Sequence, residues 1–185
     1  MIKDSKKKLS PITTTLHWLI AIVLISLIAV GIYMEENEVF FLYPIHKSIG
    51  MLLFSVILIR VVWRIKSGWP EPVSQYKKIE QIGARTIHWV LIIGTVMMPI
   101  SGMLMSGAGG YGLSIFGLEL LASNPDELNP GKVIPLSKSL AGLGHTLHEL
   151  GGNIMIFAIT LHIIGAFKHH FIDKDSTLRR MLGRR

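Results

Sequence analysis

The chain has 185 residues, 50% of them hydrophobic, with a mean hydropathy of +0.48 and a formal net charge of +7. So apolar a composition excludes an ordinary soluble domain and indicates an integral membrane protein. The absence of cysteine excludes disulfides, iron–sulfur ligation and thiolate chemistry, so any metal must be held by other side chains.

Four stretches are apolar enough to cross a bilayer, which takes about 20 residues of helix. They are residues 12–33, 46–65, 86–105 and 140–167. We therefore predict an all-α protein, in which residues 1–185 form a single membrane domain with a bundle of four transmembrane helices. The first stretch follows a basic N-terminus, as a secretory signal does, but it is too long for one and no cleavage site follows it. We interpret it as the first span.

Lysine and arginine cluster at one end of the predicted spans, as they do on the cytoplasmic flanks of membrane proteins. Both termini are therefore expected to be cytoplasmic, and the net charge to serve topology and attraction to lipid rather than nucleic-acid binding. All four tryptophans fall at the same interface, where amphipathic rings are favoured. These residues are Lys3, Lys6, Lys7, Lys8, Arg60, Arg64, Lys66, Lys77, Lys78, Arg85, Lys168, Lys174, Arg179, Arg180, Arg184 and Arg185, with Trp18, Trp63, Trp69 and Trp89.

The outer loop, residues 106–139, is much the longest connection between the predicted spans. It opens with four glycines and contains three prolines, and long loops in compact proteins are usually functional or disordered. Its segment 113–122 is apolar enough to lie on the membrane surface as a short helix. We therefore expect a lid over the outer side of the bundle.

Four histidines lie in the spans, where an ionisable residue is costly and is presumed functional until a partner is found. His148 and His162 are 14 residues apart, which is nearly four helical turns, so they share one face about 21 Å apart along the axis. His17 lies at the depth of His162, and His46 at the depth of His148. Depth therefore pairs His17 with His162 and His46 with His148. Two stacked pairs predict two haems, each held non-covalently between two imidazoles.

A small residue follows each of these histidines by four positions, where a bulky side chain would displace a macrocycle. The corresponding positions after His88 and His145 hold larger residues. His88 is nonetheless the main rival of His17 as the partner of His162, and His145 is expected to face the aqueous loop. The small residues are Ala21, Gly50, Gly152 and Ala166.

Arginine is the next candidate for a contact with the cofactor. Arg60 lies 14 residues after His46, on the same interior face and at the depth of the cytoplasmic pair. Its guanidinium could bind a haem propionate there, or it could extend to the lipid headgroups. Arg64, one turn further, is expected to contact headgroups.

A quinone site is expected at the cytoplasmic end. The ring of a quinone such as ubiquinone or menaquinone favours aromatic contact, and its carbonyl oxygens need a hydrogen-bond donor. Trp18 and Trp89 offer flat rings at this interface, and His169 continues the face of the two ligand histidines of the fourth span. The alternative is that these side chains only anchor the bundle among the headgroups. No residue is assigned a catalytic role.

Four segments carry a resemblance to a known family and cover nearly the full length: Leu16-His17-Trp18-Leu19, His46-Lys47-Ser48-Ile49-Gly50, the pair His148 and His162, and the tail from Lys168 to Leu178. The chain resembles the bacterial cytochrome b-561 family, and more loosely the cytochrome b subunits of membrane hydrogenases and formate dehydrogenase. The resemblance implies a four-helix bundle with two b-type haems, and its pattern pairs the same histidines as depth does. Family members pass electrons between a periplasmic donor and membrane quinone, and some oxidise superoxide at the outer haem.

We therefore predict a dihaem cytochrome of the bacterial inner membrane that transfers electrons between a periplasmic donor or redox protein and the quinone pool. Two alternatives remain. A superoxide:quinone oxidoreductase would gather cations around the outer haem, where Lys47, Lys132 and Lys138 lie among several acidic residues. A haem-free proton or metal transporter would need a continuous polar path, which Met155 and other apolar residues interrupt.

Overall fold

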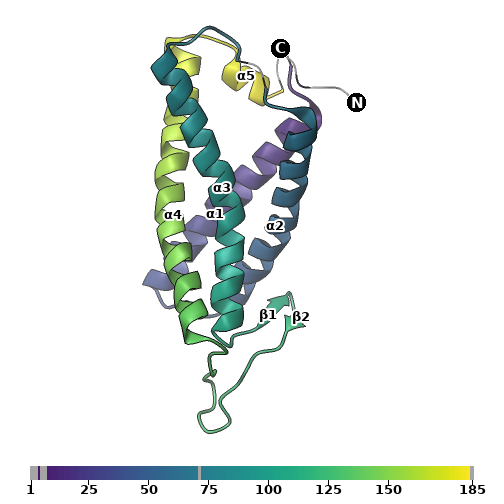
Figure 1. Cartoon of the computed structure of the whole chain (residues 1–185), viewed down its shortest axis with the longest axis vertical. Coiled ribbons are helices and arrows are strands. Elements are labelled where there is room, and N and C mark those ends of the chain that lie inside the picture. The colour runs from purple at the N-terminus through teal and green to yellow at the C-terminus, as the bar shows by residue number, and fades with distance from the viewer. Residues whose placement is uncertain (1–3, 5–7, 71, 184–185) are drawn as a thin grey trace.

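The structure, a computed structural model, describes residue 4, residues 8–70 and residues 72–183. Within these residues, four long helices run along one another as a bundle (Figure 1). Each is long and apolar enough to cross a membrane, which confirms the predicted all-α membrane bundle. The helices are α1 (Pro11–Glu36), α2 (Leu42–Ser67), α3 (Lys78–Ala108) and α4 (Lys138–Phe167).

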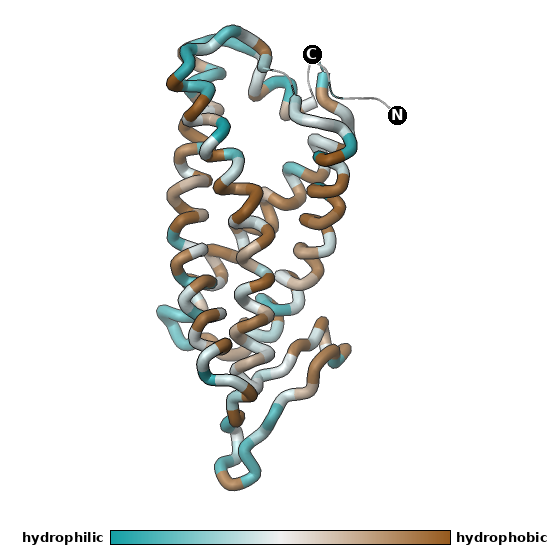
Figure 2. The backbone as a smooth tube through the Cα atoms, in the orientation of Figure 1, coloured by the Kyte–Doolittle hydropathy of each residue, from teal (hydrophilic) through white to brown (hydrophobic). Residues whose placement is uncertain are grey.

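The start of α1 and the end of α4 lie at the same end of the bundle, which we call the inner end; the opposite end is the outer end (Figure 1). Hydrophobic residues predominate along the helices, whereas hydrophilic residues gather in the connections (Figure 2). All four helices extend beyond the predicted spans at one end or both, and α3 begins eight residues before residue 86. Five of the basic residues that were assigned to the inner side lie outside the described residues: Lys3, Lys6, Lys7, Arg184 and Arg185.

Local sequence explains where two of the helices begin. Ser10 is the N-cap of α1, and its hydroxyl accepts a hydrogen bond from the Thr13 amide at 3.2 Å, with Pro11 at the first helical position. Ser137 caps α4 in the same way by accepting from the Leu140 amide. These caps satisfy amide groups that have no partner within the helix.

The bundle consists of two closely packed helix pairs. α1 packs mainly on α2, and α3 packs mainly on α4. Glycines allow the second pair to approach: a Cβ atom at Gly144 of α4 would lie 2.5 Å from the Met105 amide nitrogen of α3. Gly94 of α3 faces the thioether of Met155 in the same way, so Met155 is fully buried. The apolar core lies between the pairs at mid-depth and contains Ile20, Leu24, Leu27, Leu53, Ile57 and Met155.

The outer loop corrects one prediction, because residues 113–122 do not form a surface helix. Strands β1 (Leu113–Ile115) and β2 (Leu118–Leu121) pair as an antiparallel hairpin, with Ile115 opposite Leu118. The two turn residues, Phe116 at φ 46° and Gly117 at φ 90°, both have positive φ, as the common two-residue hairpin turn requires. The hairpin lies on the flank of α2 instead of forming a helical lid (Figure 1).

The chain crosses the inner end after α4. A single π-helical turn, η1 (Lys168–Ile172), continues α4, and a short helix, α5 (Thr177–Met181), follows it. α5 lies across the inner end (Figure 1), and its Met181 carbonyl accepts a hydrogen bond from the Trp18 indole at 2.9 Å. The C-terminal segment is thereby attached to α1.

Candidate cofactor-binding sites

Two pairs of histidine rings face each other, one near each end of the bundle. The ring centroids of His17 and His162 are 6.1 Å apart, and those of His46 and His148 are 6.3 Å apart. α4 contributes one histidine to each pair, whereas the partners come from α1 and α2. Each histidine pair therefore joins the α1/α2 pair of helices to the α3/α4 pair.

The spacing within each pair fits one metal held between two imidazoles. Imidazole nitrogens bind first-row metals at about 2 Å, so two rings on opposite sides of one metal have centroids about 6 Å apart. The side chains of these four histidines are half-buried, whereas those of the rivals His88 and His145 are exposed. In the absence of cysteine, this donor set matches bis-imidazole ligation of a haem iron.

In the outer pair, the backbone of α3 holds the His148 ring. Its Nδ1 atom lies 3.0 Å from the Met98 carbonyl oxygen and 3.1 Å from the Ser101 hydroxyl. Ser101 is fully buried and donates its own proton to the same carbonyl at 2.9 Å. Because both groups can accept from an Nδ1–H, the proton is held on Nδ1 and the Nε2 lone pair is left for a metal.

Two glycines let the outer rings approach neighbouring helices closely. A Cβ atom at Gly102 would lie 3.2 Å from Cε1 of His148, and one at Gly31 would lie 3.4 Å from Cε1 of His46. The Nδ1 atom of His46 is buried and has no hydrogen-bond partner among the described residues. A buried ring nitrogen without a hydrogen-bond partner is uncommon in a folded protein and marks His46 as a candidate functional residue.

The two glycines that follow the outer ligands leave room beside them. A Cβ atom at Gly50 would meet no other atom within 4 Å, and one at Gly152 would meet only the Met98 methyl group at 3.9 Å. Gly50 follows His46 by four residues, and Gly152 follows His148 by four. The space that a macrocycle needs is therefore open at these two positions.

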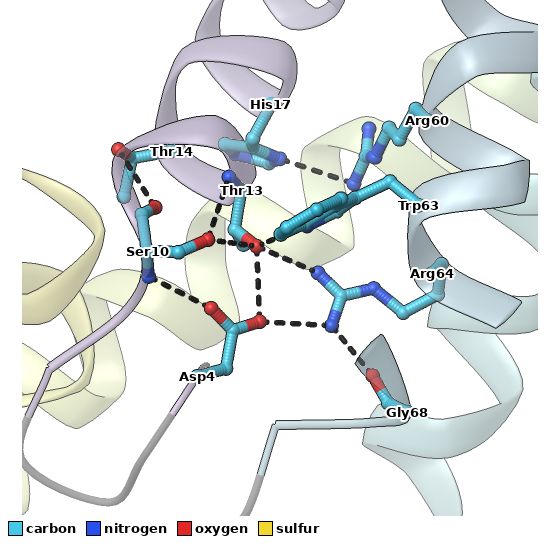
Figure 3. Close-up of polar contacts among 9 residues, drawn as sticks. All are labelled: Asp4, Ser10, Thr13, Thr14, His17, Arg60, Trp63, Arg64 and Gly68. Atoms are coloured by element: carbon cyan, nitrogen blue, oxygen red, sulfur yellow. Dashed lines mark hydrogen bonds and ion pairs between the residues drawn. The ribbon is translucent and has the colours of Figure 1, made fainter. Parts of the chain in front are cut away.

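A guanidinium group lies beside the inner pair (Figure 3). Nη2 of Arg60, from α2, is 3.3 Å from Nδ1 of His17, so the interior face predicted for Arg60 is the one it occupies. Arg60 is half-buried and at the level of the inner ligands. It is the only cation in contact with a ligand histidine in the described part of the chain.

The expectation that Arg64 contacts headgroups is wrong, since its side chain turns towards the protein (Figure 3). Nη1 of Arg64 lies 3.1 Å from the Asp4 carboxylate and donates to the Gly68 carbonyl at 2.8 Å. Asp4 also accepts from the Ser10 amide and the Thr13 hydroxyl. Burial opposes ionisation of Asp4, but these hydrogen bonds and that from Arg64 lower the pKa of its carboxyl group.

His17 and His88 both contact His162, but their rings lie at different distances from it. The ring centroids of His88 and His162 are 5.4 Å apart, which is shorter than two rings on opposite sides of one metal require. The two residues also lie on α3 and α4, which pack directly on each other. The geometry therefore favours His17 as the partner of His162, with His88 in contact on the other side.

His169 and Trp18 lie in two different surroundings at the inner end. Nδ1 of His169 is 2.9 Å from the Asp173 carboxylate and 3.1 Å from that of Asp175, and the ring contacts Tyr76. The Trp18 ring instead contacts the His17 ring edge to face, with centroids 5.5 Å apart. Trp18 also forms a wall of an apolar pocket of about 540 Å³ lined by Thr14, Thr15, Trp18, Leu19, Ile22, Met181, Leu182 and Gly183.

Between the two histidine pairs the bundle has an apolar, buried core. Met155, halfway between His148 and His162 on α4, is fully buried against Gly94 and belongs to the apolar core. The transporter alternative needs a continuous polar path, and the described residues at mid-depth do not provide one. Electrons can cross such a barrier between two redox centres, whereas ions cannot.

Sequence reasoning did not assign Met98, Ser101 or Gly31 to a site. A carbonyl group carries no signal in the sequence, and small residues are common in membrane helices for packing alone. The adjacent Ser101 and Gly102, near the outer end of the third span, were the available signal. The sequence did not show which other span Ser101 and Gly102 face, because that depends on the rotation of α3 about its axis.

Comparison with known proteins gives a consistent family. A family model described as prokaryotic cytochrome b561 matches residues 8–184. The chain is 32% identical over 188 residues to cytochrome b561 homolog 2 of Escherichia coli (strain K12), in a match that covers 98% of this chain and 94% of that protein. It is 26% identical over 179 residues to the probable superoxide oxidase CybB of Yersinia pestis, with 95% and 96% covered.

Cytochrome b561 homolog 1 of E. coli is 24% identical over 175 residues, with 92% of this chain and 94% of that protein covered. The matched length includes all four long helices and both histidine pairs. The chain therefore belongs to the prokaryotic cytochrome b561 family of membrane electron-transfer proteins, which bind b-type haem.

Proposed function

We propose that the protein binds two b-type haems and transfers electrons across the bacterial inner membrane between a periplasmic donor and the quinone pool. The observation that carries this proposal is the presence of two histidine pairs, with ring centroids 6.1 and 6.3 Å apart. About four turns of α4 separate the two pairs. His17 and His162 hold the inner haem, and His46 and His148 hold the outer one. Haem b, when bound, supplies the one-electron iron chemistry.

The residues around each pair hold and tune the ligands. Met98 and Ser101 keep the His148 ring fixed and its proton on Nδ1, which raises the basicity of the ligating nitrogen. With two histidines to hold each haem, the chain would leave no position open for oxygen, so the chemistry supplied would be outer-sphere electron transfer. The buried apolar layer around Met155 excludes water between the two sites.

Arg60 has a second role in this proposal. Arginine is always a donor, so its contact at 3.3 Å requires His17 Nδ1 to accept, which leaves the proton on Nε2. An axial ligand needs the opposite tautomer when Nε2 binds the metal. With His17 as a ligand through Nε2, the Arg60 guanidinium would need another acceptor, and a haem propionate would be the natural anion for it.

The quinone site of this proposal is the pocket at the inner end, for ubiquinone or menaquinone. Trp18 stands between this pocket and His17, so one ring contacts both the quinone and a haem ligand. The exposed Thr15 offers a hydroxyl donor at the pocket wall. His169 acts on the pocket indirectly. It contacts the Asp175 carboxylate, which accepts from the amide of Thr177, the first residue of α5, and the last residue of α5 lines the pocket.

A second candidate function is superoxide oxidation at the outer haem, with quinone as the acceptor. Two observations favour it: one relative is named a probable superoxide oxidase, and Lys47 adjoins a candidate outer ligand, His46. The Lys47 ammonium is half-buried and donates to the Ser106 hydroxyl at 3.1 Å. A cation here attracts a small anion to the outer haem.

A haem count on the purified protein, with reduced-minus-oxidised spectra, tests the main proposal. We expect two b-type haems per chain; one haem or none would contradict it. The quinone site is tested with Trp18→Ala, which should slow oxidation of the chemically reduced protein by a soluble quinone while both haems remain. Trp69→Ala is the matched control, because Trp69 contacts Trp89, with the two rings tilted, and does not line the pocket.

Superoxide is tested separately. Wild-type protein mixed with a superoxide source and quinone should reduce the quinone faster than the uncatalysed reaction if the second candidate holds. Lys47→Gln should then reduce that rate while electron input from an uncharged chemical reductant is unchanged. An equal rate in the variant would remove Lys47 from the proposal.

A further inference from the structure

The tip of the β1/β2 hairpin is apolar and exposed. Phe116 is 64% exposed, Leu118 67% and Leu120 58%, although they lie side by side on one short hairpin. The tip is strongly hydrophobic in Figure 2, in contrast to the hydrophilic turn at the far end of the same loop. A soluble surface rarely carries such a cluster without a partner.

The depth of the tip identifies the surrounding medium. The Ser48 hydroxyl of α2 accepts from the Phe116 amide at 2.9 Å. It directs its one proton to the Pro44 carbonyl at 2.7 Å, with the Ser114 carbonyl 3.3 Å away. Ser48 follows Tyr43 by five residues, which places it about 7 Å further into the bundle along the helix. Phe40, Phe41 and Tyr43 have exposed aromatic rings, which are typical of the membrane–water interface and mark its level at the outer end of the bundle.

The hairpin is therefore held on the lipid-facing flank of α2, deeper than the aromatic ring of Tyr43. Figure 1 shows its tip turned back along α2 from the outermost part of the loop. Cross-strand pairing places Ile115 and Leu118 on one face and Ser114 and Glu119 on the other. Such a two-faced element suits the boundary between acyl chains and headgroups.

The backbone of the tip is also prepared for an apolar medium. Amides and carbonyls exposed to lipid are costly unless they are paired within the protein. β1 and β2 pair with each other, and the Phe116 amide at the turn donates to the Ser48 hydroxyl of α2, which is itself almost completely buried. The hairpin thus presents apolar side chains to the lipid while its Phe116 amide is satisfied by α2.

We propose that this hairpin inserts its tip, Phe116 to Leu120, into the outer leaflet and anchors the long loop against the membrane beside α2. The occupant of the apolar surface is lipid acyl chain, continuous with the lipid that surrounds the helices. The polar remainder of the loop, residues 122–137, is left in water. The ends of α3 and α4, beside the outer histidine pair, are then the side from which a soluble donor approaches.

The chain has no cysteine, so single cysteines can be introduced and labelled cleanly. Leu118→Cys reports on the tip, and Leu128→Cys is the matched control in the same loop, where Leu128 is 89% exposed. Each full-length variant is labelled with an environment-sensitive fluorophore in lipid nanodiscs, which leave both faces open to solution. Quenching is measured with lipids brominated on the acyl chain and, separately, with aqueous iodide.

We expect the Leu118 label to be quenched several-fold more by acyl-chain bromine than the Leu128 label, and several-fold less by iodide. Equal iodide quenching at the two positions would overturn the proposal, because the tip would then lie in water. Protection from both quenchers would also overturn it, since a protein surface would then cover the tip. Neither result depends on haem content, so this test is separate from that of the proposed function.

Ser48→Ala in the Leu118→Cys background tests what holds the tip at its depth. Loss of the hydroxyl leaves the Phe116 amide without its partner, and the label should become more accessible to iodide. Unchanged quenching would contradict the role of Ser48. Ser48→Thr keeps the hydroxyl and serves as the control for folding of α2.

Discussion

The Nδ1 atom of His148 lies 3.0 Å from the carbonyl oxygen of Met98, on the neighbouring helix. A backbone carbonyl cannot change its charge and moves little, so it orients the imidazole more rigidly than a long side chain would. The same ring lies against Gly102, one turn along α3 from Met98. α3 thus positions a ligand that belongs to α4.

Gly102→Ala should weaken haem binding at the outer site. The new Cβ atom would lie 3.2 Å from Cε1 of His148, and the ring cannot retreat without lengthening its hydrogen bond to Met98. We expect about half of the total haem to be lost or to show altered axial ligation, measured by haem content and low-temperature spectra. Gly83→Ala on the same helix is the control, because a Cβ atom there meets nothing within 4 Å.

Histidine substitutions should separate the two haems. His148→Ala and His162→Ala are each expected to remove one haem, because in the proposed assignment each residue is a ligand of a different haem. His145→Ala should keep both. An unchanged haem content in either of the first two variants would refute the assignment.

The inner partner is tested by comparing two variants. His17→Ala should lose the inner haem and His88→Ala should retain it, because only the first ring has the spacing for a shared metal, 6.1 Å against 5.4 Å. Haem counts and redox titration distinguish the two. The reverse pattern would make His88 the ligand.

Arg60→Leu should lower the midpoint potential of the inner haem. A half-buried cation beside the ligand disfavours the more positive, oxidised form of the iron, so its removal favours oxidation. A shift on the order of 60 mV, a tenfold change in a one-electron equilibrium, is expected. Arg60→Lys should retain much of the original value, and the outer haem should not change. Redox titration of both haems is the measurement, and equal shifts in the two haems would indicate a general structural effect.

Asp175→Asn should destabilise the protein at neutral pH and have little effect in acid. Burial opposes ionisation of Asp175, but hydrogen bonds from Tyr76 and Thr177 lower the pKa of its carboxyl group. A carboxylate with a lowered pKa stabilises the fold above its unfolded pKa of about 3.9, and this stabilisation is lost as the pH falls through the folded value.

The difference in Tm between wild type and Asp175→Asn should therefore be a few degrees at pH 7 and shrink below about pH 4. Thermal unfolding in detergent at several pH values measures it. Glu127→Gln in the outer loop is the control. A difference that stays constant down to pH 3 would show that the carboxylate charge contributes nothing.

Hydropathy and residue spacing alone were sufficient for the four helices and for the depth of each histidine. An α-helix rises by a constant amount per residue, so 14 residues between His148 and His162 determine their separation whatever surrounds them. The bilayer requires every spanning segment to be apolar, helical and about 20 residues long, which is why composition predicts the bundle. The position of Arg60 at the level of the inner pair followed from the same spacing.

The contacts between side chains were decided by tertiary packing. They depend on the rotation of each helix about its axis and on which helix lies next to it. His17 and His88 have similar depth in the sequence, and in the structure the distance of each ring from His162 separates them, 6.1 Å for His17 and 5.4 Å for His88. Arg64 turns to Asp4, a residue 60 positions away, and not to the headgroups. The segment 113–122 has the hydrophobicity of a surface helix, but two positive φ angles and the Ser48 hydroxyl make it a hairpin. Contacts between distant residues carry no period in the sequence, so only the folded chain reveals them.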